Sequence, residues 1–167
     1  MTWRALTFVQ PWATAIMLHG KNIENRRWAP RSLLGKRFAV HAGKSIDTDD
    51  AWNLQHELDD ALDMDKLPLG ALLGTVELVG YLDFRPLAKP LPQQTQASSV
   101  GLSTDQQLDA LSSRWASKGS LCLWVLRNPL VLETPIPCKG ARNFWRVPDE
   151  HVAALDELER GNEHAHL

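Results

Sequence analysis

The chain has 167 residues and a formal net charge of -2, and 44% of its residues are hydrophobic while 23% are charged. These values are typical of a globular protein with an apolar core. They exclude a protein that binds nucleic acid through a strongly basic overall charge, so only a local basic patch remains open. The two cysteines, Cys122 and Cys138, have neither the spacing of a zinc site nor the number of a disulfide scaffold.

No apolar run approaches the ~18 residues that span a bilayer, and the amino-terminal residues lack the pattern of a signal peptide. We therefore expect a reduced, soluble, cytoplasmic protein with no membrane partner. The sequence suggests no cofactor and no metal site, and it makes no prediction about oligomeric state.

The first elements are a short apolar run over residues 5–9 and a helix that begins at Gln10-Pro11-Trp12 and ends at Gly20. Proline suits a first helical turn, and glycine commonly follows a helix end. Residues 21–28 have the length of a strand. Residues 37–42 alternate between apolar and polar side chains, which predicts a half-buried strand.

Residues 47–62 show helical spacing of apolar side chains, with Thr48 as a possible cap, and residues 70–84 form the longest strand candidate. Residues 89–101 are rich in Pro, Gln and Ser, and we expect a mobile surface loop. The remaining predicted elements are a helix over 103–115, a buried strand over 121–126, and a helix from Asp149.

Helices and strands are interspersed without regular alternation, which argues against a doubly wound parallel sheet. The pattern predicts an α+β fold, with a small mixed or antiparallel β-barrel and surrounding helices. We expect a single domain over residues 1–155, followed by a frayed carboxyl-terminal tail over residues 156–167.

Residues 19–28, HGKNIENRRW, concentrate polar chemistry in a segment of strand length. Alternation places Glu24, Arg26 and Trp28 on one side of such a strand, while Lys21 follows Gly20 at its start. A carboxylate buried alone would be costly, so Glu24 needs a cationic partner. A solvated, ion-paired edge strand and a binding site both satisfy this pattern.

Two segments, LTFVQPWATAIMLHGKNIENRRW and FAVHAGK, resemble the ASCH domain, a member of the PUA-like superfamily. The family signature is a Gln-Pro-aromatic helix start followed by a G-x-K-x-x-E-x-R motif. Lys21, Glu24 and Arg26 occupy its last three positions, and the family glycine position is His19. PIPCKGARNFWRV is similar to the closing segment of small stand-alone ASCH proteins, so the resemblance covers residues 4 to about 150.

The resemblance implies a small β-barrel with a cleft where Lys21, Glu24 and Arg26 converge, in a fold that elsewhere binds RNA or a modified base. A carboxylate can accept from a base amino group, and cations can hold phosphate. Trp28 would supply a stacking face. The implied partner is RNA, single-stranded nucleic acid, or a nucleoside or other small ligand.

Five further residues are candidates for the same site. His41 and Lys44 lie three positions apart in FAVHAGK and could line the cleft, although a structural role for the histidine is equally compatible. Glu77 lies inside an apolar strand, and we expect it to have a cationic or hydrogen-bonding partner. Lys139 and Arg142 flank Gly140 near an indole and form the best local basic-aromatic patch.

Two function classes remain open. The first is a binding module for RNA or a modified nucleotide. The second is a small hydrolase, because some ASCH relatives are amidohydrolases acting on N4-acetylcytidine-type nucleosides and one is described as a ribonuclease. Those amidohydrolases have a threonine where this chain has Glu24, so the hydroxyl nucleophile is missing. Lys21 and Glu24 would carry acid-base catalysis only if the protein is an enzyme.

Overall fold

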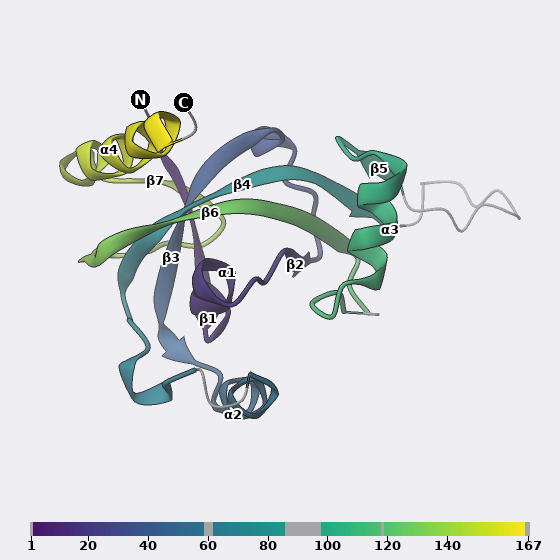
Figure 1. The fold of residues 1–167 in the computed structure, drawn as a ribbon, viewed down its shortest axis with the longest axis horizontal. Coiled ribbons are helices and arrows are strands. Elements are labelled where there is room, and N and C mark those ends of the chain that lie inside the picture. Colours follow the sequence, from purple (N-terminus) through teal and green to yellow (C-terminus); the bar gives the residue numbers. More distant parts are fainter. Residues whose placement is uncertain (1, 59–61, 86–97, 118, 166–167) are drawn as a thin grey trace, which may run out of the picture. The chain divides into compact units, whose positions relative to one another are not determined.

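The computed structural model describes residues 2–58, 62–85, 98–117 and 119–165 (Figure 1). The predicted loop over 89–101 falls largely outside these ranges. The elements in chain order are β1 (Arg4–Gln10), α1 (Trp12–Leu18), β2 (Ile23–Arg26), η1 (Arg31–Leu33), β3 (Lys36–Ile46), α2 (Thr48–Glu57), η2 (Met64–Lys66), β4 (Ala71–Asp83), β5 (Ser98–Val100), α3 (Thr104–Ser112), β6 (Cys122–Pro137), β7 (Phe144–Arg146) and α4 (Asp149–Ala165).

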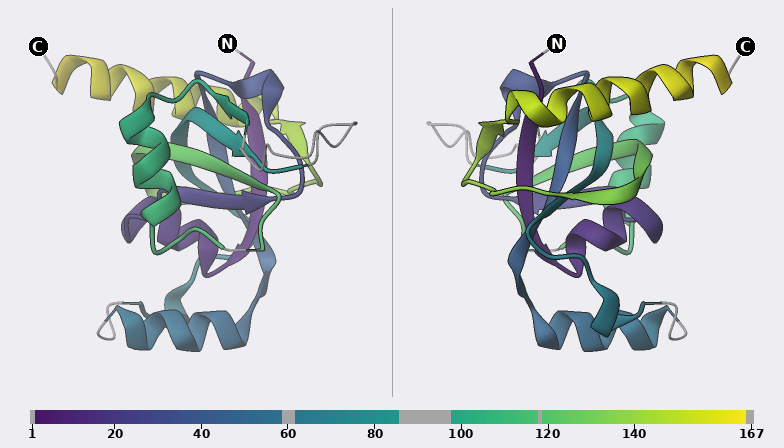
Figure 2. Two further views of the ribbon diagram at one scale, coloured as in Figure 1. Left: turned by 90° about the vertical axis from the view of Figure 1, so that its right-hand side faces the viewer. Right: turned by 90° about the vertical axis from the view of Figure 1, so that its left-hand side faces the viewer.

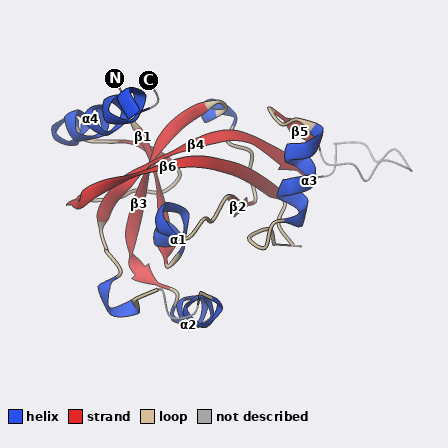
Figure 3. Ribbon diagram, viewed as in Figure 1, coloured by secondary structure: helices blue, strands red, loops and turns tan. Residues whose placement is uncertain are grey.

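The strands hydrogen-bond in the order β2-β6-β4-β3-β1-β7, and β5 pairs with β4. Figure 3 colours the strands red and the helices blue. Pairing is mixed, because β1 runs parallel to β3 but antiparallel to β7. The predicted α+β class with a mixed sheet is therefore confirmed. Within the described residues the strand order ends at β2 and β7 and does not close, so the word barrel describes it only loosely.

The chain divides into two compact units. Unit 1 comprises residues 1–20, 38–76 and 129–167, and unit 2 comprises residues 21–37 and 77–128. Strands β3, β4 and β6 each contribute residues to both units. The expectation of one domain over residues 1–155 stays a prediction.

The core of unit 1 contains Trp3, Leu72 and Leu155, which come from its amino-terminal segment, β4 and α4. At the start of α1, the Gln10 side chain accepts from the backbone N–H of Thr14 and donates to the Thr14 hydroxyl. It thereby supplies a hydrogen-bond acceptor to the first helical turn, which the side chain of Pro11 at the N-cap cannot do. On β4, a Cβ on Gly74 would lie 2.0 Å from the Leu130 carbonyl oxygen, so this close approach requires glycine.

The core of unit 2 forms where β2 and β6 meet α3. Ile23 pairs with Val125 across the antiparallel strands, and both pack against Ala110 of α3. Ser103 caps α3 in a capping box with Gln106, as the predicted helix start at residue 103 requires. Figure 1 shows α3 beside the adjacent ends of β4 and β6.

Three predicted boundaries are wrong. Helix α2 ends at Glu57, before residue 62, and its cap is Asp47, which accepts from the backbone N–H of Asp50. Residues 98–100 of the predicted loop form β5, because their backbone groups pair with Tyr81 to Asp83. Strand β6 continues past residue 126 to Pro137. Its second half contains prolines and polar side chains, so the sequence there lacks the apolar pattern of a strand.

The described part of the predicted tail over 156–167 is helical, because α4 continues to Ala165. Two side-chain hydrogen bonds anchor this helix to the rest of unit 1. Trp3 Nε1 donates to Asp156 at 2.8 Å, and Thr75 Oγ1 donates to Glu159 at 2.6 Å. Figure 2 shows α4 beside β1 and β7. These tertiary contacts stabilise a segment whose own sequence shows little periodicity.

Candidate functional site

The candidate site starts from β2, whose side chains alternate as the sequence predicts. Glu24 lies opposite Trp124 and Arg26 opposite Cys122 in the antiparallel pair with β6. Ile23 is fully buried in the core of unit 2, which fixes the strand in register. Glu24 and Arg26 therefore share the other face of β2.

Lys21, Glu24 and Arg26 form one ion-paired cluster. Glu24 Oε1 lies 2.7 Å from Arg26 Nε, and Glu24 Oε2 lies 3.5 Å from Lys21 Nζ. Glu24 is 8% exposed and Lys21 is 5% exposed. The Lys21 ammonium also donates to the backbone carbonyl of Ile23. The predicted convergence of these three side chains is thus present in the geometry of unit 2.

Burial changes the acid-base properties of Lys21. Desolvation lowers the pKa of this amine below its usual range, while the attraction of Glu24 opposes that shift and Arg26 adds to it. A buried ammonium beside a carboxylate can exchange a proton more readily than a surface lysine can.

Three indoles surround the cluster. The ring of Trp115 lies 5.9 Å from Lys21 Nζ, and the ring of Trp124 lies 5.9 Å from the Arg26 guanidinium carbon. Trp28 meets Trp124 edge to face at 4.7 Å. These distances are typical of cation–π and aromatic pairs. A cation–π contact stabilises a cation that is partly removed from water. Trp124 is fully buried and structural, whereas Trp28 is half-buried.

The two asparagines of the polar segment connect β2 to residues 113–117. Asn25 Nδ2 donates to the Trp115 carbonyl at 2.8 Å, and Asn25 Oδ1 accepts from the backbone N–H of Ser117 at 2.8 Å. Asn22 Oδ1 accepts from Ser113 Oγ at 2.9 Å. Strand β2 lies at one end of the strand order, and the amides of Asn22 and Asn25 also hold residues 113–117 against it.

A pocket of about 490 Å³ opens beside this strand. One wall is formed by Asn25, Arg26, Arg27 and Trp28, and the other by residues 117 and 119–121. Ser120 in the second wall donates to the Cys122 carbonyl at 2.9 Å. Two arginines, serine hydroxyls and one indole give this pocket a cationic and partly aromatic lining.

Glu77 belongs to the same unit, and its predicted partner is present. Asn128 Nδ2 donates to Glu77 Oε2 at 2.9 Å, so the prediction of a hydrogen-bonding partner is confirmed. Asn128 adopts a left-handed backbone conformation with φ 51°, which asparagine tolerates better than most residues.

The other four predicted site residues lie in unit 1. His41 is 2% exposed, donates from Nε2 to the Cys138 carbonyl at 2.9 Å, and packs edge to face on Trp145 at 5.4 Å. These contacts match the structural histidine of the two readings, and the role of His41 in a binding site stays a prediction. Lys44, Lys139 and Arg142 are exposed cations, and their role in binding stays a prediction.

Sequence reasoning missed the second wall of the pocket. Ser117 and Ser120 carry no motif, and they reach β2 only through contacts with residues more than ninety positions away. The available signal was the pair Asn22 and Asn25, whose amides need partners wherever a strand is half-buried.

Among residues 2–58, 62–85, 98–117 and 119–165, no group of three or more His, Cys, Asp or Glu side chains is arranged to hold a metal ion. Within the same residues no helix has the length and apolar character needed to cross a membrane.

No protein-family model matches the sequence, and no curated protein matches it. Among solved structures, the fold is similar to that of ASCH from Zymomonas mobilis, with a TM-score of 0.46 and 18% sequence identity over 93% of this chain and 94% of that chain. A mutant of the Zymomonas mobilis protein gives a TM-score of 0.47 at the same identity and coverage. Both structures carry the name of the family that the sequence motifs resemble.

Proposed function

We propose that unit 2 binds a nucleotide or a single-stranded RNA in the pocket beside β2. The observation that carries the proposal is the position of Arg26. Its guanidinium is paired with the buried carboxylate of Glu24 at 2.7 Å, and the same residue lines the pocket together with Arg27 and Trp28. The oriented guanidinium can bind the phosphate of a nucleotide, and the adjacent indole can stack on its base.

The cluster residues have different parts in this proposal. Glu24 is paired through both oxygens, so it orients Arg26 and its direct contact with ligand is secondary. Lys21 balances the charge of Glu24 from the buried side. Arg27 is exposed and contributes phosphate attraction, and half-buried Trp28 offers stacking area.

The test is fluorescence polarisation with a labelled single-stranded RNA, and with AMP as competitor. Arg27→Ala should weaken RNA binding by about 1 kcal/mol and reduce its salt dependence, because one phosphate contact is lost. Arg127→Ala is the matched control, since Arg127 is also exposed in unit 2 but does not line the pocket. Equal effects of the two substitutions, or no binding by the unaltered protein, would overturn the proposal.

Hydrolysis of an acylated nucleoside or of RNA is the second candidate function. It is favoured by one observation, the buried Lys21 amine with a lowered pKa 3.5 Å from a carboxylate. In this reading Glu24 accepts a proton from the attacking water, and the Lys21 ammonium donates a proton to the leaving group.

Mass spectrometry of acylated nucleosides and short RNAs after incubation with the protein tests this second function. Product that forms with the unaltered protein and is lost in Lys21→Met would support hydrolysis. Nucleic-acid binding without any product would reject hydrolysis and retain the binding proposal.

A further inference from the structure

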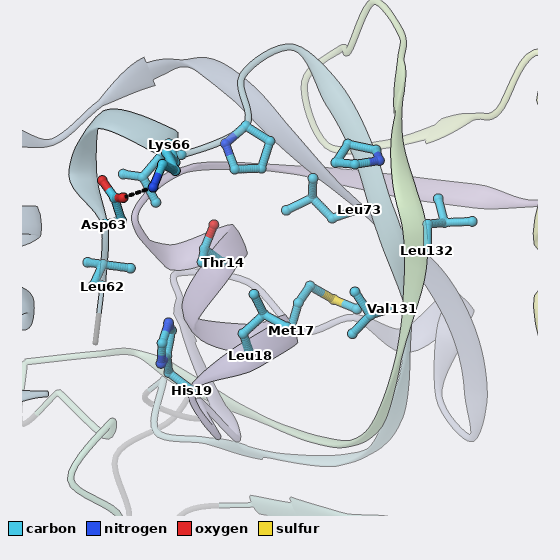
Figure 4. A pocket seen from close by; sticks show the side chains of 13 residues that line it. Thr14, Met17, Leu18, His19, Leu62, Asp63, Lys66, Leu73, Val131 and Leu132 are labelled. Atoms are coloured by element: carbon cyan, nitrogen blue, oxygen red, sulfur yellow. Dashed lines mark ion pairs between the residues drawn. The ribbon is translucent and has the colours of Figure 1, made fainter. Parts of the chain in front are cut away.

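A second pocket, of about 240 Å³, lies wholly within unit 1 (Figure 4). It is bounded by α1, by residues 62–68, by β4 and by the second half of β6. Lys21, Glu24 and Arg26 do not line it. Whatever it binds is therefore independent of the function proposed for unit 2.

One end of this pocket is apolar. Figure 4 shows Met17, Leu73, Val131 and Leu132 together at that end. Met17 and Leu73 are each 5% exposed and Val131 is 42% exposed, so this end combines buried apolar side chains with one that solvent reaches. An apolar group that enters this end gains dispersion contacts and removes apolar surface from water.

Two neutral hydrogen-bonding groups, Thr14 and His19, also line the pocket. Thr14 is 6% exposed, and its oxygen accepts from Gln10 Nε2 at 2.9 Å. Among the described residues the Thr14 hydroxyl hydrogen has no acceptor, and the His19 imidazole has no hydrogen-bond partner either. Burial lowers the pKa of His19 below its usual 6.5, so at pH 7 the ring is neutral, with one donor and one acceptor.

The charged side chains at the rim cancel one another. Lys66 Nζ lies 2.8 Å from Asp63 Oδ2, and Figure 4 marks this ion pair beside Leu62. The lining therefore carries no net charge, and an ionic ligand would lose hydration without gaining a counterion.

We propose that this pocket binds a neutral, mainly apolar small molecule whose single hydrogen-bonding group faces Thr14 and His19. The size follows from the volume, because an apolar cavity of about 150 Å³ in a protein holds benzene. A pocket of 240 Å³ holds one aromatic ring with a substituent. The apolar end takes the ring, and the hydroxyl and imidazole take the polar substituent.

Phenol, toluene and benzoate are the probes, because they share one ring and differ in polarity and charge. Their affinities are measured by NMR titration of the labelled protein. Phenol should bind most tightly, toluene more weakly because it cannot satisfy Thr14 and His19, and benzoate weakest because of its charge. Benzoate binding that equals or exceeds phenol binding would overturn the proposal.

Val131→Trp should fill the apolar end and weaken phenol binding by about tenfold or more. Val9→Trp is the matched control, because Val9 is 45% exposed on β1 while Val131 is 42% exposed, and only Val131 lines the pocket. If Val131→Trp does not fold, Leu18→Trp gives the same test, since Leu18 also lines the pocket and is 62% exposed. Phenol binding that survives the filling substitution contradicts the proposed site.

His19→Phe tests the polar contact separately from the apolar ones. It should reduce the preference for phenol over toluene while leaving toluene binding within about twofold, because only the polar contact is removed. An unchanged preference for phenol over toluene would show that bound phenol does not contact His19.

Discussion

The two units bury polar side chains in opposite ways. In unit 2, β2 buries charges that are paired with each other, since Glu24 lies within 4 Å of both Lys21 and Arg26. In unit 1, β3 buries the single imidazole of His41, which contacts the Cys138 carbonyl and the Trp145 indole. The charges on β2 are stabilised by ion pairing, whereas the His41 ring is buried in its neutral form.

This difference decides what each arrangement is sensitive to. A buried ion pair depends on every member, because removing one leaves an uncompensated charge. A buried neutral ring depends on shape, because its neighbours must leave room for it and satisfy its N–H. Charge changes should therefore affect the β2 cluster most, and volume changes should affect the surroundings of His41 most.

The largest expected effect is that of Glu24→Gln. The substitution keeps the side-chain shape but leaves buried Lys21 and partly buried Arg26 without their carboxylate. We expect the free energy of unfolding to fall by about 3 kcal/mol, measured by urea denaturation. Asp63→Asn is the control, because it breaks the exposed Asp63–Lys66 pair and should leave stability unchanged. Similar effects of the two substitutions would mean that the β2 cluster behaves as a surface pair.

A smaller effect is expected from Gly140→Ala, which tests the shape of the His41 surroundings. The added Cβ would lie 2.5 Å from His41 Cε1 and 2.7 Å from Thr7 Oγ1, and Thr7 already accepts from Trp145 Nε1. We expect a loss of about 1–3 kcal/mol in unfolding free energy, because the ring and the hydroxyl must move.

Gly119→Ala is the control for this volume change, since a Cβ there meets nothing within 4 Å. Thermal unfolding of the two variants side by side gives the comparison. A melting temperature for Gly140→Ala that equals the control would show that the contact relaxes without cost.

The sequence predicted the local part of this comparison. Period-two alternation placed Glu24 and Arg26 on one face, and the cost of a lone carboxylate required a partner, which the structure provides. The start of α3 at Ser103 and the extent of β4 also follow from short-range signals, namely a capping residue and an apolar run.

What the sequence did not predict depends on distant residues. The second half of β6 is a strand although it contains Pro129, Pro135 and Pro137, and α4 extends past residue 156 because Trp3 and Thr75 anchor it. For His41, alternation left a site and a structural role equally open. Its burial beside Trp145 depends on a contact between residues about a hundred positions apart, and no local pattern encodes it.

The smallest expected effect is the pH dependence that His41 contributes to stability. Burial lowers the pKa of His41 below its usual 6.5 in the folded protein, although its hydrogen bond to the Cys138 carbonyl opposes the shift. As pH falls through 6.5, the unfolded chain therefore binds a proton that the folded protein does not, and unfolding becomes more favourable. The contribution is fully present above pH 6.5 and is lost as pH falls toward the lower, folded-state pKa.

His41→Gln removes this contribution while keeping an amide that can donate to the Cys138 carbonyl. Urea denaturation between pH 5 and pH 8 should show that the unfolding free energy of the unaltered protein falls more steeply toward low pH than that of the variant. His19→Gln must be measured in parallel, because burial lowers the pKa of His19 in the same direction and the two contributions add. If the unaltered protein and His41→Gln have parallel pH profiles, His41 binds protons equally in the folded and unfolded states. The contrast between a paired charge in unit 2 and a buried neutral ring in unit 1 then fails.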